Sequence, residues 1–178
     1  MTNQIHLQPI EPYRDAVAGD HKATNRTAKK KIVYSEKSFS EANILDAIQY
    51  AREQMNDGEA RALYESHALA RGRSARSLAM YDYLISPTIR KIDATKYTGV
   101  VGETIRIRAV DDFMVVTVGV LIANAYGQVI ERGGAVPQIT QDQWLYRITA
   151  WNEYIPGCSI IVSAHDVAGN TTSLTLQL

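Results

Sequence analysis

The last part of the chain alternates between apolar and polar residues in a way that few folds accommodate. Every second residue of segment 158–166 is apolar, which gives an extended strand one apolar face: Cys158, Ile160, Val162 and Ala164. A Gly169-Asn170 turn follows, and residues 171–178 form a closing strand. This pattern predicts the final hairpin of a β-sandwich, because antiparallel sheets bury one face and expose the other.

Five segments upstream, which are separated by turn signals, are also predicted to be strands, and most of them show the same period of two. They are a strand with Ile89 and Ile92, then segments 102–110, 116–122, 129–131 and 144–150. Arg106 and Arg108 are predicted to face outward, and segment 133–143 is predicted to be a loop. The residues predicted to face inward are Ile105, Ile107, Ala109, Val116, Val118, Val120, Ile122, Trp144, Tyr146, Ile148 and Ala150. Seven short antiparallel strands are typical of an immunoglobulin-like sandwich.

The spacing within these strands resembles a bacterial Ig-like (Big-type) domain over residues 88–178. The motifs that carry the resemblance are Ile105-x-Ile107-x-Ala109-x-Asp111, Val116-x-Val118-x-Val120-x-Ile122, Gly127-x-x-Ile130-Glu131, Trp144-x-Tyr146 and Ile160-x-Val162-x-Ala164-x-Asp166-x-Ala168-Gly169-Asn170. The resemblance implies a sandwich that serves as a spacer or binding module, as in adhesins and surface enzymes.

Residues 38–87 have a period near 3.6, which predicts three short helices. In the first, Ser38 and Glu41 are expected to form a capping box and Gly58 to end the helix, with an apolar face of Ile44, Leu45, Ile48, Ala51 and Met55. The second runs to Gly72 and is expected to bury Ala60, Leu63, Tyr64, His67 and Ala68. The third runs from Ser74 to Ser86-Pro87, with Ala75, Leu78, Tyr81 and Leu84 or Ile85 inward. Such small helices form a marginal core alone, so we expect them to pack on the rest of the chain or on another copy in a homo-oligomer.

The change of period at Pro87 divides the chain and predicts an α+β fold class: a short helical N-terminal region followed by a seven-stranded antiparallel Ig-like β-sandwich. The expected parts are a flexible basic arm (1–37), a helical region (38–87) and the sandwich (88–178). Formal net charge is zero, and no apolar run is long enough to insert in a membrane. The N-terminus lacks the pattern of a secretory signal, which predicts a cytoplasmic protein or one exported by a non-classical route.

The residue patterns that usually mark an active site do not occur in this sequence. Cys158 and His165 are an odd number of residues apart on one predicted strand, so their side chains point to opposite faces and form no dyad. The histidines at positions 6, 21, 67 and 165 lack metal-binding spacing, and no glycine-rich phosphate loop is present. We therefore expect a protein that is not an enzyme, in which Cys158 is a small buried apolar residue.

Carboxylates gather in the loops of one predicted end of the sandwich. Alternating strand directions bring Asp111-Asp112, the 133–143 loop with Asp142, and Asp166 to Asn170 to the same end. Carboxylate and amide oxygens are the ligands that Ca²⁺ prefers, so Asp111, Asp112, Asp166 and Asn170 form a candidate calcium site. The alternative is that no cofactor binds and these side chains cap turns through bonds to the backbone.

Two further segments are candidates for binding a partner. The arm with Lys29, Lys30 and Lys31, together with a basic turn of Arg71, Arg73 and Arg76, could grip nucleic-acid phosphates; the alternative is a solvated arm and loop. Segment 151–156 begins with Trp151 and lies at the end of the sandwich opposite the aspartates. An exposed aromatic residue there would indicate a sugar or protein contact, and the more common alternative is a loop tryptophan folded over the end of the sandwich. The leading expectation is a non-catalytic interaction or structural module that binds a protein or carbohydrate through sandwich loops, and the alternative is a nucleic-acid-associated protein.

Overall fold

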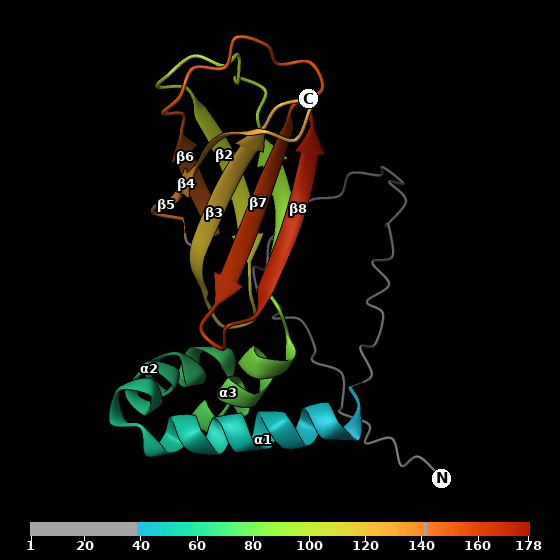
Figure 1. The fold of residues 1–178 in the computed structure, drawn as a ribbon. Coiled ribbons are helices and arrows are strands. Elements are labelled where there is room, and N and C mark those ends of the chain that lie inside the picture. Colours follow the sequence, from blue (N-terminus) through green and yellow to red (C-terminus); the bar gives the residue numbers. More distant parts are fainter. Residues whose placement is uncertain (1–38, 141) are drawn as a thin grey trace, which may run out of the picture.

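The structure, a computed structural model, describes residues 39–140 and 142–178. The predicted basic arm with Lys29, Lys30 and Lys31, and the predicted cap Ser38, lie outside the described residues. The described part consists of helices stacked against one end of a two-sheet sandwich, with the C-terminus at the other end (Figure 1).

The helical region contains α1 (Glu41–Asn56), α2 (Gly58–Ala68), a single 3₁₀ turn η1 (Leu69–Arg71) and α3 (Ala75–Leu84). Ser40 caps α1 by accepting a hydrogen bond from the Asn43 amide, so the helix begins two residues after the predicted start. Asp57 ends α1 and caps α2 by accepting from the Ala60 amide at 2.8 Å. The prediction that Gly58 terminates α1 is therefore wrong, because the Asp57 cap starts a new helix at that glycine.

The buried face of α1 is rotated from the predicted one. Ile44, Ala47 and Ala51 are buried, whereas Leu45 and Ile48 are exposed. Small alanine side chains allow α1 to approach α3 closely, and that packing rather than side-chain hydrophobicity selects the face. On α3 the buried residues are Leu78, Ala79 and Asp82, with Tyr81 half-buried.

The rest of the described chain forms eight antiparallel strands in two sheets, which confirms the predicted α+β class with a β-sandwich but gives one strand more than the seven predicted, because β5 lies within the predicted 133–143 loop. One sheet has the order β1-β2-β6-β5 and the other β4-β3-β7-β8. The strands are β1 (Thr88–Asp93), β2 (Thr104–Val110), β3 (Val115–Ala123), β4 (Val129–Gly134), β5 (Val136–Pro137), β6 (Gln143–Arg147), β7 (Ser159–Asp166) and β8 (Thr171–Gln177). Part of the predicted loop 133–143 is therefore a strand, because β5 lies within it and pairs with β6. The two sheet orders are those of immunoglobulin-type sandwiches with one additional edge strand.

The core between the sheets follows the predicted alternation in most strands. Ile105, Ile107 and Ala109 of β2 are buried, and all four predicted residues from Cys158 to Ala164 are buried as well. Val116 is an exception, because the register of β3 shifts between Val115 and Thr117 and turns Val116 to solvent. A β-bulge of this kind inserts one residue and reverses the faces on its far side.

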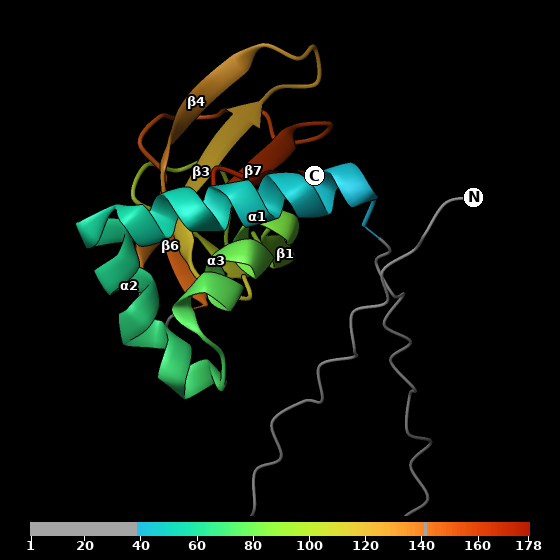
Figure 2. The same ribbon diagram turned by 90° about the horizontal axis from the view of Figure 1, so that it is seen from below.

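The helices lie across the end of the sandwich where β2 meets β3 and β7 meets β8 (Figures 1 and 2). The β2–β3 turn inserts Phe113 into the helical cluster, where its ring stacks on Tyr64 with a centroid distance of 4.6 Å. Met114 and Val167 from the same end of the sandwich also pack against this cluster. The sandwich therefore supplies part of the apolar core of the helical region.

Candidate functional site

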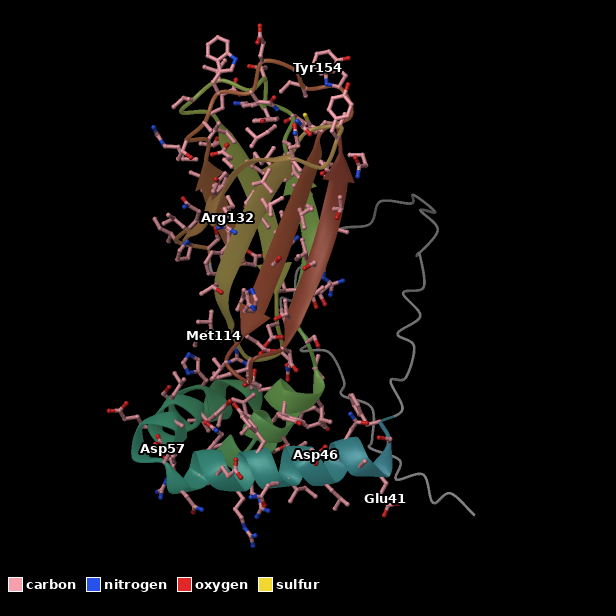
Figure 3. The ribbon with its side chains drawn as sticks, in the orientation of Figure 1. Glu41, Asp46, Asp57, Met114, Arg132 and Tyr154 are labelled. Atoms are coloured by element: carbon pink, nitrogen blue, oxygen red, sulfur yellow. The ribbon has the colours of Figure 1, made fainter. Side chains whose placement is uncertain are left out.

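The end of the sandwich far from the helices exposes an unusual set of apolar side chains. Three loops meet there, formed by residues 94–103, 124–128 and 148–158, and Figure 3 shows Tyr154 at this end. The exposed fractions are 50% for Val100, 55% for Val101, 70% for Trp151 and 67% for Tyr154. We call these four residues the aromatic pole. Clustered exposed apolar side chains on a rigid scaffold mark a contact surface more often than an isolated one does.

Two loops of the pole are fixed to each other at Gly99. The Asn152 amide donates to the Gly99 carbonyl at 2.9 Å, and the buried Asn152 side chain donates to the Tyr97 hydroxyl at 3.0 Å. Gly99 has φ +90°, and a Cβ there would lie 2.0 Å from the Asn152 carbonyl oxygen. Only glycine permits this approach, which places the neighbours Val100 and Trp151 on adjoining loops.

Glu103 holds the turn that presents Val100. Its carboxylate accepts from the Thr98 amide at 2.7 Å, the Thr98 hydroxyl at 2.6 Å and the Val100 amide at 3.2 Å. These bonds favour the charged form, and the hydrogen bond from the Thr98 side chain is the main reason that the pKa of Glu103 is lowered. The turn is thus closed by a charged group at its base.

The loop of residues 148–158 also packs against the loop of residues 124–128. A Cβ at Gly157 would lie 2.9 Å from the Ala125 Cβ, and the Gly157 amide donates to the Leu178 carbonyl at 3.0 Å. Asn124 braces its own loop by accepting from the Tyr126 amide at 3.0 Å. All three loops are therefore held against one another or against the end of β8.

A buried carboxylate on β4 anchors the start of the loop that carries Trp151. One oxygen of Glu131 accepts from the Thr149 amide at 2.9 Å, the Thr149 hydroxyl at 2.5 Å, the Ala150 amide at 3.2 Å and the Tyr146 hydroxyl at 3.1 Å. Burial, followed by the nearby Glu131 charge, raises the pKa of Tyr146 to about 12. Tyr146 therefore stays protonated and donates to Glu131 at neutral pH.

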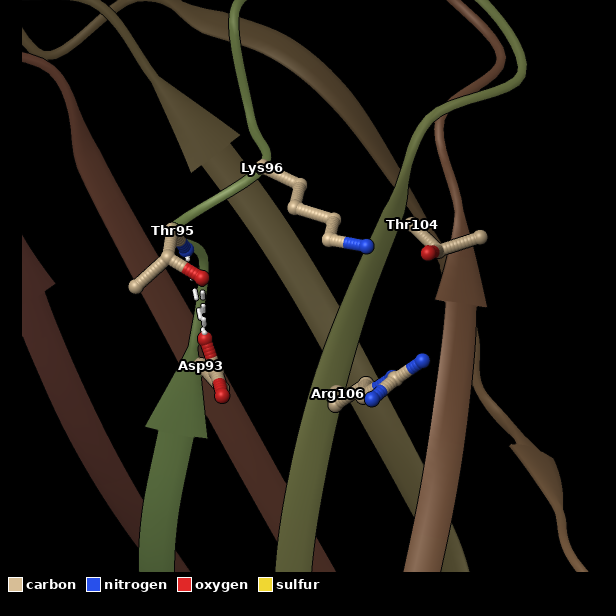
Figure 4. Close-up of a pocket in the computed structure, with 5 residues that line it drawn as sticks. All are labelled: Asp93, Thr95, Lys96, Thr104 and Arg106. Carbon is tan, nitrogen blue, oxygen red and sulfur yellow. Dashed lines mark hydrogen bonds between the residues drawn. The ribbon is translucent and has the colours of Figure 1, made fainter.

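Two concavities lie along the side of the sandwich rather than at its ends. A groove of about 550 Å³ includes Arg132, Val136 and Arg147 in its lining. A pocket of about 30 Å³ between β1 and β2 is lined by polar side chains, among them Asp93, which accepts from the Thr95 hydroxyl at 2.8 Å (Figure 4). The smaller one is large enough to hold a water molecule.

The residues of the candidate calcium site lie at the end of the sandwich that faces the helices. Asp111, Asp166 and Asn170 lie close to Asp82, a residue for which the sequence analysis predicted no role. One carboxylate oxygen from each of Asp82, Asp111 and Asp166 lies within 4.8 Å of the other two. Asn170 turns its amide nitrogen toward this group, donating to Asp166 Oδ2 and to the Asp82 carbonyl, each at 2.8 Å. Asn170 therefore positions the cluster with its N–H groups instead of adding an oxygen to it.

Asp112 and Asp142 do not join this cluster. Asp142 makes an ion pair with Arg108 at 2.6 Å. Asp112 is half-buried beside Asp111, and burial followed by the Asp111 charge raises the pKa of Asp112 to about 7. Both are therefore separate from the three converging carboxylates.

Burial dominates the electrostatics of Asp82 and Asp111. It raises the pKa of Asp82 to about 7, with a hydrogen bond from Tyr64 at 2.6 Å opposing the shift and the charge of Asp166 adding to it. Burial also raises the pKa of Asp111, against hydrogen bonds from the Phe113 and Met114 amides. Asp82 was missed in the sequence, although its spacing of four from Leu78 places it on the buried face of α3.

The arginines proposed to contact nucleic acid have different environments. Arg71 donates to the Asp112 carbonyl at 2.9 Å and to the Phe113 carbonyl at 2.7 Å, and so ties η1 to the β2–β3 turn. The Arg73 guanidinium lies 3.9 Å from the centroid of the Tyr81 ring. Arg76 is exposed. Two of the three therefore have partners within the protein.

No protein-family model matches the sequence, and no curated protein matches it. Among solved structures, an engineered protein is 21% identical with a TM-score of 0.37; the likeness covers 51% of this chain, which spans 18% of that protein. CopC from Methylosinus trichosporium OB3b is 10% identical with a TM-score of 0.35, covering 50% of this chain and 87% of CopC. A lipoprotein from Bacteroides thetaiotaomicron is 17% identical with a TM-score of 0.26, covering 52% and 76%. The resemblance to the bacterial Ig-like family stays a prediction.

Within residues 39–140 and 142–178, no helix combines the length and the hydrophobicity needed to cross a membrane.

Proposed function

We propose that the protein is a non-catalytic interaction module that binds a protein partner through the aromatic pole. The observation that carries the proposal is the exposure of Trp151 beside Val100 and Val101, on loops that Gly99 and Asn152 fix together. Tryptophan and tyrosine are enriched among residues that dominate protein interfaces. Because the loops are already braced, binding would order few additional groups and would lose little conformational entropy.

The mixture of side chains supports a protein rather than a carbohydrate. Sugar rings stack on aromatic faces but need hydrogen-bonding groups around them, whereas Val100 and Val101 offer none. Two branched aliphatic residues next to Trp151 form a surface that fits an apolar patch on another protein. Burying about 150 Å² of the indole would contribute roughly 4 kcal/mol before the entropy of association is subtracted.

The first experiment compares variants of the immobilised full chain for proteins retained from a lysate of the cells that make it. The test variant is Trp151→Ser with Val101→Ser, and the matched control is Leu69→Ser, which alters a residue that is 90% exposed near the opposite end. The proposal expects a protein that wild type and control retain and the test variant does not. Equal retention by all three would refute it.

In the second experiment, the retained partner protein is purified and added in increasing amounts to the full chain. Binding is followed by acrylamide quenching of tryptophan fluorescence. Trp144 is buried and Trp151 exposed, so quenching reports mainly on Trp151. Binding at the aromatic pole should reduce the quenching constant of wild type and leave Trp151→Phe with little change. A glycan array probed with the same variants covers the carbohydrate alternative. Glycan binding that depends on Trp151, with no retained protein, would move the function to carbohydrate recognition.

A further inference from the structure

The end of the sandwich that faces the helices contains a buried concentration of negative charge without an ion-pair partner. Asp82 is fully buried and Asp166 is 5% exposed. The ion pairs in residues 39–140 and 142–178 join Arg61 to Glu65, Lys91 to Asp93 and Arg108 to Asp142, so none of them neutralises the cluster. Carboxylates at this separation in a buried place repel one another strongly unless a proton or a cation lies between them.

The unused oxygens point to a cation. Asp82 accepts from Tyr64 through Oδ2, while its Oδ1 is buried without a hydrogen-bond partner. Asp111 accepts from two backbone amides through Oδ2, and its Oδ1 is likewise buried and unpartnered. A single proton would satisfy one of these oxygens, whereas a metal ion binds oxygens from all three carboxylates at once.

We propose that Asp82, Asp111 and Asp166 bind a calcium ion that fastens the helical region to the sandwich. All three donors are carboxylates, which Ca²⁺ accepts in mono- or bidentate form at about 2.3–2.6 Å. Two oxygens on opposite sides of such an ion lie about 5 Å apart, a separation compatible with the 4.8 Å limit within this group. Mg²⁺ holds its ligands closer and retains several waters, which a buried site of three side chains accommodates less well.

The three ligands come from different parts of the chain, so a bound ion would connect the helical region to the sandwich. Asp82 lies on α3, Asp111 in the β2–β3 turn and Asp166 at the end of β7. Asn170 adds a bridge across the same junction through the carbonyls of Asp82 and Tyr83. Calcium would thus stabilise the contact between helices and sandwich, independently of the aromatic pole.

Terbium luminescence provides a direct test with the full chain. Tb³⁺ replaces Ca²⁺ at oxygen sites and emits when a nearby tyrosine is excited, and the Tyr64 hydroxyl lies 2.6 Å from Asp82 Oδ2. Wild type should show saturable emission that calcium displaces. Asp82→Asn should abolish it, whereas the control Asp142→Asn should keep it because Asp142 pairs with Arg108 away from the cluster.

Thermal unfolding gives the second readout. Calcium at a hundredfold excess over its Kd should raise the Tm of wild type by about 5–10 °C relative to chelator. Asp82→Asn removes one repelling charge, so its Tm in chelator should exceed that of wild type while the calcium increment disappears. Asp111→Asn should likewise lose the increment and serves if the first variant fails to fold. Wild type without terbium emission, and with the same Tm in millimolar calcium and in chelator, would overturn the proposal.

Discussion

Phe113 offers the sharpest test of how the two parts of the protein are joined. It belongs to the β2–β3 turn of the sandwich but is only 3% exposed because its ring lies within the helical cluster. The ring stacks on Tyr64 at 4.6 Å, meets the edge of His67 at 5.4 Å and lies 5.7 Å below the Arg71 guanidinium. Phe113→Ala would remove the part of the helical core that the sandwich supplies.

The expected cost is about 4 kcal/mol. Truncating a buried phenylalanine to alanine typically costs about 3–5 kcal/mol, and the aromatic stack on Tyr64 accounts for about 0.5–1.5 kcal/mol of that. The ring contacts that would be lost, with Tyr64, His67 and Arg71, lie on the helical side of the junction. The sandwich core, built from residues such as Ile107 and Val162, is unchanged by the substitution. The loss of stability should therefore be concentrated in the helices.

Hydrogen exchange measures this distribution directly. Amides of α2 and α3 should lose about three orders of magnitude of protection in Phe113→Ala, since each 1.4 kcal/mol is a factor of ten. Amides of β7 should keep the protection they have in wild type. Leu69→Ala is the control, because Leu69 is 90% exposed and its truncation should change neither set.

Two results would contradict this reasoning. An equal loss of protection in α2 and β7 would mean that helices and sandwich unfold as one cooperative unit. Unchanged protection in α2 would mean that Phe113 does not contribute to the helical core.

Three further predictions concern the sandwich, the aromatic pole and the acidic cluster. Val118→Asp should cost several kcal/mol by placing an unpaired charge in the core, and an unchanged midpoint in urea denaturation would show that β3 is misassigned. Gly99→Ala should lower the Tm by more than 4 °C because its Cβ meets Asn152, whereas Gly134→Ala, with nothing near its Cβ, should be close to neutral; equal Tm values would contradict the loop geometry. In chelator, the unfolding free energy should fall as pH rises from about 4 to about 7, because the pKa of Asp82 is raised from 3.8 to about 7 and the folded state keeps a proton that the unfolded state has released. This stability is complete below pH 4 and lost above pH 7, and Asp82→Asn should reduce the slope in urea titrations without removing it, because the pKa of Asp112 is also raised to about 7; a wild-type slope of the opposite sign would be inconsistent with the raised pKa.

Local periodicity predicted the sandwich well because it reports burial on one face directly. The apolar alternation from Cys158 to Ala164 and from Ile105 to Ala109 corresponds to buried positions throughout. The periodicity failed where one residue changes the register. The bulge at Val116 leaves no sequence signal, since a valine suits either face of a strand. The two-residue strand β5 is too short to show any period.

The helix faces were harder to predict, because the partner decides which side of a helix is buried. Leu45 and Ile48 are more hydrophobic than Ala47, yet Ala47 is buried because a small side chain permits close packing between helices. Hydrophobicity alone therefore adds Leu45 and Ile48 to the buried face of α1, although it assigns Ile44 and Ala51 correctly. The same reasoning applies to Asp82, which sequence patterns treat as a solvent-facing residue although it lies on the buried side of α3.

The two ends of the sandwich therefore differ in a way that strand alternation could not predict. Alternation assigns Asp111, Asp166 and Asn170 to one end and Trp151 to the other, but it does not say what covers each end. The helices cover the acidic end, and Asn170 bonds to the Asp82 carbonyl across a separation of 88 residues. The helices thereby bury Asp166 and half-bury Asp111, where their charge requires compensation, while the apolar side chains of the far end stay in solvent. Because polar groups are buried at one end and apolar groups are exposed at the other, the physical chemistry of each end supports the binding that we propose for it: a cation at the helical junction and a protein surface at the aromatic pole.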